Sequence, residues 1–546
     1  METVARTYCA RGKRDQNGGM VTRYEYDAVG RPVKFTAYTG SNNDVVYAYD
    51  AAGRIAQMTN PYNQVFDYEW TDRGELSKIT WDARVWDFEY NALGQRTQYT
   101  HPNGTRTEYA YDNWHRLTGI YHKNASTNAV LDSFEYTLSD GNDITRIDHA
   151  DGANWRYVYD DRGRLEKAYR YAYADTMEYY YEYIYDAADN MTKYWSWDTL
   201  VWHSTDYEYN AGNEQISMTR TGATPETRTY DAWGRLATRT QDSHTATYEY
   251  RYGDRLYQVL SDFPGESDSP VYDYGADGKL RRRGAHEIQY GLGFNPVAQR
   301  TTLFTHRMYV YEPHKMVSER LAYFGAGFDP SQWHYYHDHL GSVRSQRDQN
   351  GGMVTRYEYG PYGAPYGNTT PLIFALHPYE SGMGFYHAPN RNYSPASARW
   401  TTPDPAGMID GPNMYGYVKG NPIMHHDPLG LWIPQAWDAL PTGGKESCLC
   451  AGRRIGNDVA ERYPGGYRDK QDHMRHCVWT CELRRETNLL CAWIVGTGYE
   501  MMPPQLGGSV DNDPFDYRSN RIGRRCGGTA LNCDACCAHE ARKRGL

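Results

Sequence analysis

The chain has 546 residues, a formal net charge of −10 and a mean hydropathy of −0.84. No apolar run approaches the roughly 20 residues that a membrane-spanning helix needs, which excludes an integral helical membrane protein. The first residues lack the apolar core of a classical secretion signal, so we expect no signal peptide. Tyrosine is the unusual residue, with 53 copies against 12 phenylalanines. A tyrosine ring fits a half-buried pleated surface, and its hydroxyl can hydrogen-bond.

The composition changes near position 431. Residues 1–431 contain 49 of the 53 tyrosines and a single cysteine, whereas residues 432–546 contain 4 tyrosines and nine cysteines. The tail holds 16 Lys and Arg against 14 Asp and Glu, a net charge of +2, which leaves −12 for the first 431 residues. We therefore expect two structurally different parts that join near this position.

The first part repeats a short motif of the form apolar-x-Tyr-Asp-x-x-Gly-Arg-Leu, twelve times at spacings of 20–26 residues. Alternation such as Tyr157-x-Tyr159 predicts a strand. The Asp-x-x-Gly segment predicts a turn, because Asp can bond its own backbone and Gly can adopt a positive φ. A series of such hairpins predicts a long wound β-sheet. The repeat positions are Tyr26, Tyr49, Trp70, Tyr90, Tyr111, Tyr136, Tyr159, Tyr185, Tyr209, Tyr230, Tyr250 and Tyr274.

A block of ordered motifs follows the repeats. It contains His337-Asp338-His339-Leu340-Gly341-Ser342, Arg399-Trp400-Thr401-Thr402-Pro403-Asp404-Pro405 and Asp427-Pro428-Leu429-Gly430-Leu431. Together, the repeats and this block resemble the YD repeats of Rhs proteins and of the C components of insecticidal toxin complexes. The resemblance implies a mainly β, cocoon-like shell (1–335), an Rhs core-associated domain (336–431) and an enclosed toxin domain (432–546).

Two features depart from the family. Family shells are usually longer than about 430 residues, so whether this one closes around a cargo stays open. The 13-residue string Arg-Asp-Gln-Asn-Gly-Gly-Met-Val-Thr-Arg-Tyr-Glu-Tyr occurs at 14–26 and again at 347–359, which indicates recombination between repeat segments.

Two Asp-Pro pairs lie at the junction. Asp404 and Asp427 are 23 residues apart, and two carboxylates that share a proton can act as general base and general acid on a peptide bond. The resemblance implies that they cut the chain once, in cis, between Leu431 and Trp432. The alternative is that both Asp-Pro steps only form turns.

The tail is predicted to be small, mostly α and cysteine-rich, with helices over 470–502 and 530–544. Its nine cysteines favour disulfides over a zinc site, because adjacent Cys536 and Cys537 and the lack of a clean second pair do not fit zinc spacing. Disulfides in turn predict action in an oxidising space such as the periplasm of a target cell.

The polar residues of the tail resemble an α-helical toxin module with the pattern Asp-x-x-Arg-His, Glu and Asp-x-x-x-Asn. Asp472 lies four residues before His476 on the predicted helix and can orient its imidazole for acid–base work. Glu500, Asp516 and Asn520 can polarise water or hold a divalent metal through oxygen ligands. The alternative is a structural role, with His476 buried and the acidic residues capping helices.

These features predict a polymorphic toxin whose shell releases a hydrolase that acts on lipid or another envelope component of competing cells. A nuclease effector is disfavoured by the near-neutral tail, although Arg518, Arg521, Arg524 and Arg525 cluster. A third alternative is a non-enzymatic surface adhesion protein with a cystine-rich tip. No cofactor is assigned, and a divalent metal in the toxin domain stays an open alternative.

The resemblance also implies partners and a route. We expect a cognate immunity protein that binds the tail, a secretion apparatus or adaptor such as type VI secretion, and a substrate in the target cell. The protein would be made in the bacterial cytoplasm and leave without a signal peptide. We expect no stable membrane insertion.

Overall fold

The computed structural model describes residues 23–36, 44–198, 201–251, 255–266, 268–275, 278–291, 295–300, 305–312, 315–323, 327–364, 373–408 and 411–431. Of these, residues 36, 44–49 and 55–431 belong to one compact unit, and 23–35 and 50–54 to another. The α-helical tail, its cysteines and its five candidate toxin residues lie outside the described residues and stay predictions. Within the described part, no helix is long and apolar enough to cross a membrane.

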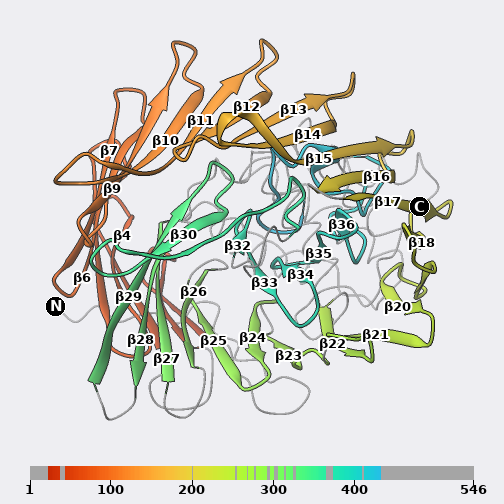
Figure 1. Ribbon diagram of the computed structural model, residues 1–546. Helices are drawn as coiled ribbons and strands as arrows, with labels where there is room; N and C mark the ends of the chain where they lie inside the picture. The colour runs from red at the N-terminus through yellow and green to blue at the C-terminus, as the bar shows by residue number, and fades with distance from the viewer. Residues whose placement is uncertain are drawn as a thin grey trace, which may run out of the picture. The chain divides into compact units, whose positions relative to one another are not determined.

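The larger unit begins with a run of antiparallel strands in which each strand pairs with its neighbour in sequence (Figure 1). These strands are β3 (Asp44–Tyr49), β4 (Ile55–Thr59), β5 (Val65–Trp70), β6 (Leu76–Trp81), β7 (Arg84–Tyr90), β8 (Arg96–Thr100), β9 (Thr105–Tyr111), β10 (Leu117–Asn124), β11 (Val130–Leu138), β12 (Ile144–His149), β13 (Asn154–Tyr159), β14 (Leu165–Ala172), β15 (Thr176–Tyr185), β16 (Met191–Asp198), β17 (Val201–Tyr209), β18 (Gln215–Arg220), β19 (Glu226–Tyr230), β20 (Leu236–Gln241), β21 (His244–Arg251) and β22 (Arg255–Ser261). A 3-10 turn, η1 (Tyr173–Asp175), joins β14 to β15.

Two further sheets complete this unit. The nine-stranded sheet contains β23 (Tyr272–Tyr274), β24 (Leu280–Arg283), β25 (His286–Tyr290), β26 (Pro296–Arg300), β27 (Thr305–Glu312), β28 (Lys315–Tyr323), β29 (Gly327–His337), β30 (Val343–Arg347) and β31 (Met353–Arg356). The five-stranded sheet contains β32 (Ile373–Phe374), β33 (His377–Glu380), β34 (Phe385–His387), β35 (Asn392–Ser394) and β36 (Arg399–Trp400), followed by the 3-10 turn η2 (Val418–Gly420). Separately, β1 (Arg23–Tyr26) pairs with β2 (Pro32–Thr36).

Each repeat forms the predicted hairpin. The repeat tyrosine ends its strand in β1, β3, β7, β9, β13, β15, β17, β19 and β23. In a typical turn, Asp160 Oδ1 accepts the backbone N–H groups of Arg162 and Arg164 at 2.9 and 3.0 Å. Asp160 Oδ2 accepts Arg164 Nε at 2.7 Å, and Gly163 takes φ 76°, where a side chain would be strained. The mainly β repeat fold is therefore confirmed for the described residues.

The repeat tyrosines account for part of the tyrosine excess. A β-bulge precedes many of them, as between Glu89 and Tyr90. Each hydroxyl then donates to the carbonyl of the first residue of an earlier strand, as Tyr90 does to Leu76 O at 2.8 Å. Phenylalanine would leave that carbonyl without this donor, which disfavours it here. The other hydroxyl donors of this kind are Tyr111, Tyr159, Tyr185, Tyr209, Tyr230 and Tyr250.

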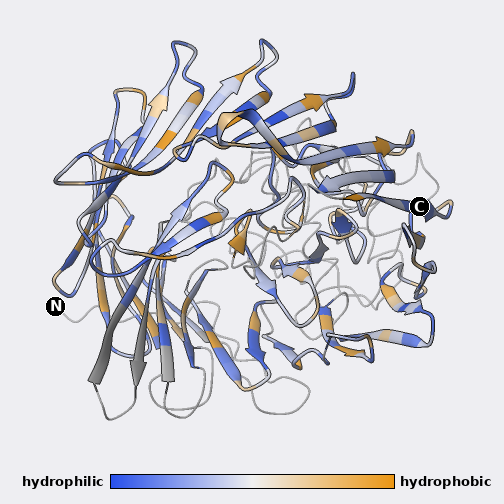
Figure 2. Ribbon diagram, in the orientation of Figure 1, coloured by the Kyte–Doolittle hydropathy of each residue, from blue (hydrophilic) through white to orange (hydrophobic). Residues whose placement is uncertain are grey.

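The core lies between the repeat strands and the block that follows them. Apolar and polar residues alternate along the strands (Figure 2), as period-two side chains require. One buried cluster joins Phe134, Trp155 and Tyr183 of the first sheet to Tyr386 and Trp400 of the five-stranded sheet. In Figure 1 the short strands β32–β36 lie on the concave side of the curved run β10–β22. The segment 336–431 is thus packed against the inner face of the repeat strands.

A histidine-rich contact joins the first sheet to β29, and we call it the histidine seam (His101, His122, His334, Tyr336 and His337). The Tyr336 ring lies 4.6 Å from the His101 ring and 5.0 Å from the His122 ring, centroid to centroid. The His101 and His334 rings are 6.2 Å apart. These imidazoles are buried, so their protonation must affect stability.

Candidate functional site

The two junction aspartates meet on one arginine. Asp404 Oδ2 lies 2.8 Å and Asp427 Oδ2 lies 3.0 Å from the same atom, Nη2 of Arg391. The exposed side-chain fractions are 3%, 2% and 1% for Asp404, Asp427 and Arg391. Carboxylates separated by 23 residues in sequence are thus brought together in a buried, charge-paired centre.

Asp404 is fixed by a turn just after β36. Its N–H donates to Met414 O at 2.8 Å, and its Oδ1 accepts the Ala406 N–H at 2.7 Å. The Gly407 N–H closes the turn onto Asp404 O at 2.8 Å. Pro405 presets the φ that the second position of such a turn needs. The carboxylate is therefore held by its own loop as well as by Arg391.

Asp427 is fixed by the turn that leads to Leu431. Asp427 Oδ1 accepts the Leu431 N–H at 2.9 Å, and Asp427 O accepts the Gly430 N–H at 3.1 Å. Gly430 takes φ 63°, and a Cβ at this position would lie 3.1 Å from Ala388 Cβ and from Arg391 N. This close approach and the positive φ explain the glycine in Asp-Pro-Leu-Gly-Leu.

The turn between β34 and β35 forms hydrogen bonds with the two residues that precede Leu431. Asn390 donates to Leu429 O through its backbone N–H at 3.1 Å and through Nδ2 at 2.9 Å. Arg391 Nε donates to Gly430 O at 2.6 Å. The guanidinium also lies over the Trp400 ring, 4.3 Å from its centroid. Hydrogen bonds to the carbonyls of Leu429 and Gly430 therefore hold the chain so that the Leu431 N–H lies against Asp427.

The electrostatics of the centre raise the pKa of Asp427. Burial is the largest cause, Arg391 opposes it, and the negative charge of Asp404 adds to it, so that the pKa of Asp427 lies at about 6. A carboxyl with this pKa can hold or release a proton near neutral pH, as general acid–base chemistry requires. The arrangement is therefore suited to general acid–base chemistry close to Leu431, whose N–H is bound to Asp427.

The sequence identified Asp404 and Asp427 but not Arg391 or Asn390. Neither residue belongs to a recognisable motif, and both come from a turn whose position depends on the five-stranded sheet. The predicted tail residues Asp472, His476, Glu500, Asp516 and Asn520 lie outside the described residues. Within the described ranges, no group of three or more His, Cys, Asp or Glu side chains is arranged to hold a metal ion.

Comparison with known proteins gives consistent similarities. Residues 6–146 match the family described as Teneurin YD-shell. Toxin subunit YenC1 of Yersinia entomophaga is 24% identical over 509 residues, which cover 77% of this chain and 49% of that protein. Double-stranded DNA deaminase toxin A of Burkholderia cenocepacia is 25% identical over 445 residues, 75% of this chain and 30% of that protein.

A solved structure has the same fold. The crystal structure of TcdB2-TccC3 without its hypervariable C-terminal region matches with a TM-score of 0.57 at 18% identity. The match covers 76% of this chain and 24% of that chain. The present chain spans about half of YenC1 and under a third of the deaminase toxin.

Proposed function

Because this chain is a YD-repeat protein related to the Rhs proteins and to toxin-complex C components, we propose that it releases a C-terminal effector by cutting itself once. The proposed cut falls between Leu431 and Trp432. The observation that carries the proposal is the buried pair of Asp404 and Asp427 on Arg391, with the Leu431 amide bound to one carboxylate.

The proposed reaction is hydrolysis of one peptide bond. The ionised carboxylate of the pair takes a proton from water, whose oxygen adds to the carbonyl carbon of Leu431. The protonated carboxyl stabilises the oxyanion, and the C–N bond breaks as the Trp432 nitrogen takes up the proton that the other carboxyl accepted from water. Asp427 is the better candidate for the protonated partner, because burial raises its pKa to about 6. The products are a Leu431 carboxylate and a Trp432 amine.

Self-cleavage in cis predicts first-order kinetics. A full-length chain made by cell-free translation should convert into two fragments at a rate that does not change when the chain is diluted tenfold. The physical reason is that Asn390, Arg391 and Asp427 of the same chain hold Leu429, Gly430 and Leu431 respectively. A rate that rises with chain concentration would contradict the proposal, as would a chain that stays intact.

The released tail is proposed to be a toxin, with a hydrolase acting on lipid or another envelope component as the first candidate. The spacing of Asp472 and His476 and the nine cysteines of the tail support it. A second candidate is an effector that acts on nucleic acid. It is supported by the relative named as a double-stranded DNA deaminase toxin, and by the arginines at 518, 521, 524 and 525.

Expression of residues 432–546 in bacteria separates these candidates. Growth arrest when the tail is directed to the periplasm supports the envelope hydrolase, and arrest in the cytoplasm supports the nucleic-acid effector. His476→Ala should restore growth in either case, because the imidazole is the proposed acid–base group. No growth effect in either compartment would favour the non-enzymatic adhesion alternative.

The proposed partners follow from the proposed toxin. A cognate immunity protein would bind the tail in the producing cell, and a secretion apparatus or adaptor would deliver the chain to its target. Synthesis in the bacterial cytoplasm and action in the periplasm or envelope of the target cell remain part of this proposal.

A further inference from the structure

The segment that holds the aspartates contacts four successive turns of the repeat sheet. In each contact, a side chain from residues 399–421 donates a hydrogen bond to a backbone carbonyl within one turn of the Asp-x-x-Gly type. The pairs are Asn421 Nδ2 to Gly163 O at 2.9 Å, Asn413 Nδ2 to Ala188 O at 3.0 Å, Arg399 Nη2 to Asn213 O, and Tyr415 Oη to Gly234 O at 2.6 Å.

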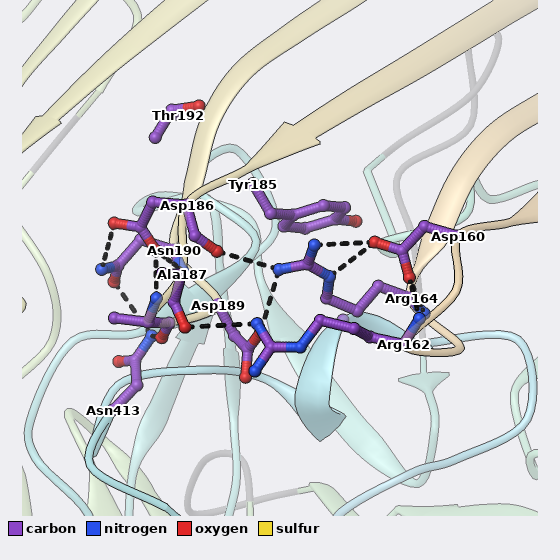
Figure 3. Close-up of polar contacts among 12 residues, drawn as sticks. Asp160, Arg162, Arg164, Tyr185, Asp186, Ala187, Asp189, Asn190, Thr192 and Asn413 are labelled. Atoms are coloured by element: carbon purple, nitrogen blue, oxygen red, sulfur yellow. Dashed lines mark hydrogen bonds and ion pairs between the residues drawn. The ribbon is translucent and has the colours of Figure 1, made fainter.

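The turns are also bonded to one another (Figure 3). Arg164 Nη1 donates to Asp186 O and to Asp189 Oδ1, at 3.0 and 2.9 Å. Asn190 Nδ2 donates to Asn213 Oδ1 at 2.9 Å, and Asn190 Oδ1 accepts Asn413 Nδ2 at 2.9 Å. The edge of the repeat sheet therefore presents carbonyls in a fixed register, which requires neighbouring hairpins to be paired.

Residues 413–415 connect this edge to the aspartates. The side chains of Asn413 and Tyr415 bond to the turns. The backbone carbonyl of Met414, which lies between them, accepts hydrogen bonds from the aspartyl centre. Met414 O accepts the Asp404 N–H at 2.8 Å and Arg391 Nη1 at 3.1 Å. Tyr415 O accepts the Trp400 N–H at 3.0 Å, and Trp400 supports the guanidinium of Arg391. A displacement of this segment must therefore displace both Asp404 and Arg391.

We infer that Asn413 and Tyr415 are positioning residues that make self-cleavage depend on assembly of the repeat turns at 186–189 and 231–234. The inference rests on the proposed self-cleavage. It adds a specific order of events: the hairpins pair, their turn carbonyls bind Asn413 and Tyr415, and the centre then reaches its cutting geometry. Cleavage before the repeat sheet forms would release an effector that nothing encloses. The dependence of the centre on the turns prevents such early cleavage.

The test compares Tyr415→Phe with a matched control, both in the full chain. Tyr111→Phe removes the same kind of bond, a tyrosine hydroxyl on a strand carbonyl at 2.9 Å, from a repeat that does not contact residues 413–415. Tyr415→Phe should slow the first-order cleavage about tenfold, since the loss of one buried hydrogen bond changes an equilibrium by roughly that factor. Tyr111→Phe should cut at the wild-type rate. The two variants should have similar melting temperatures.

The pH profile separates positioning from a general structural role. When Met414 O shifts, Arg391 supports the ionised carboxylate less well, so the acidic limb of the rate profile should move to higher pH in Tyr415→Phe. Asn413→Ala, which loses the bonds to Ala188 and Asn190, should show the same two effects.

The outcomes distinguish the inference from the function on which it rests. An uncut wild-type chain overturns the proposed self-cleavage. A wild-type chain that cuts, with Tyr415→Phe and Asn413→Ala equal to it in rate and pH profile, overturns the positioning role alone. Equal slowing of cleavage by Tyr111→Phe also overturns the positioning role, because the cleavage rate would then depend on the stability of the repeat sheet in general.

Discussion

Replacing Asp427 by asparagine is expected to leave the full-length chain of 62.9 kDa uncut on a denaturing gel. Asparagine keeps the shape of the side chain and can still accept the Leu431 N–H, but it cannot carry the shared proton. Loss of an acid–base group lowers rates by roughly 10²–10⁴-fold. Arg391 would keep Asp404 as its charged partner, so we expect the fold to survive.

The matched control for this substitution is Asp112→Asn. Asp112 also accepts two backbone N–H groups, from Trp114 and Arg116, and pairs with an arginine, Arg116, at 2.7 Å. It lies in a repeat turn and has no contact with Asp404 or Asp427 among those described. Asp112→Asn should therefore be cut like the wild type. Cleavage of Asp427→Asn at the wild-type rate would remove Asp427 from the reaction.

Mild acid, between pH 6.5 and pH 4, is expected to destabilise the described fold through its buried histidines. Burial lowers the pKa of His334 and of His377 to about 3 and that of His387 to about 4, and it lowers the pKa of His101 well below 6.5. The unfolded chain takes up protons on these residues below about pH 6.5, and the folded chain does not. Their contribution to stability is therefore complete above pH 6.5 and is lost progressively as the pH falls toward 3–4.

The size of this effect follows from the number of groups. Each buried neutral histidine lowers the free energy of unfolding by about 1.4 kcal/mol for each unit by which the pH falls in this window. Asp132, Glu319 and Asp427 have raised pKa values and act in the opposite direction. The positive charge of Arg84 lowers the pKa of His334 further, and the negative charge of Asp348 raises it. We expect the free energy of unfolding to fall by about 2 kcal/mol between pH 6 and pH 5.

Urea unfolding at pH 7, 6 and 5 measures this slope. His334→Phe removes one buried imidazole from the histidine seam and should reduce the slope by about one proton. His203→Gln is the control, because the side chain of His203 is 51% exposed and should leave the slope unchanged. A free energy of unfolding that is flat from pH 7 to pH 5, or a slope unaffected by His334→Phe, would contradict the role of the seam.

The repeat fold was predictable because its information is local. An Asp-x-x-Gly turn after alternating tyrosines specifies a hairpin within about ten residues, and the structure contains that hairpin in successive repeats. The function of the tyrosine hydroxyl was less accessible. Tyr90 donates to Leu76, 14 residues earlier, and this pairing depends on the register of three strands.

The aspartyl centre was predictable only in part. Asp404 and Asp427 belong to ordered motifs, whereas Arg391 enters from a turn 13 residues before one aspartate and 36 before the other. Its position depends on the pairing of β34 with β35 and on the Trp400 ring beneath it. Long-range packing of this kind leaves no periodic signal in a single sequence. The four contacts of residues 399–421 with the turns were hidden for the same reason.

The proposed cut between Leu431 and Trp432 can be located directly. The direct measurement is the intact mass and N-terminal sequence of the smaller fragment formed by the purified wild-type chain. We predict a fragment of the 115 residues 432–546 whose sequence starts Trp-Ile-Pro. A fragment that starts at any other residue, or a wild-type chain that remains at 62.9 kDa, would contradict the assignment of Asp404, Asp427 and Arg391 as a self-cleavage centre.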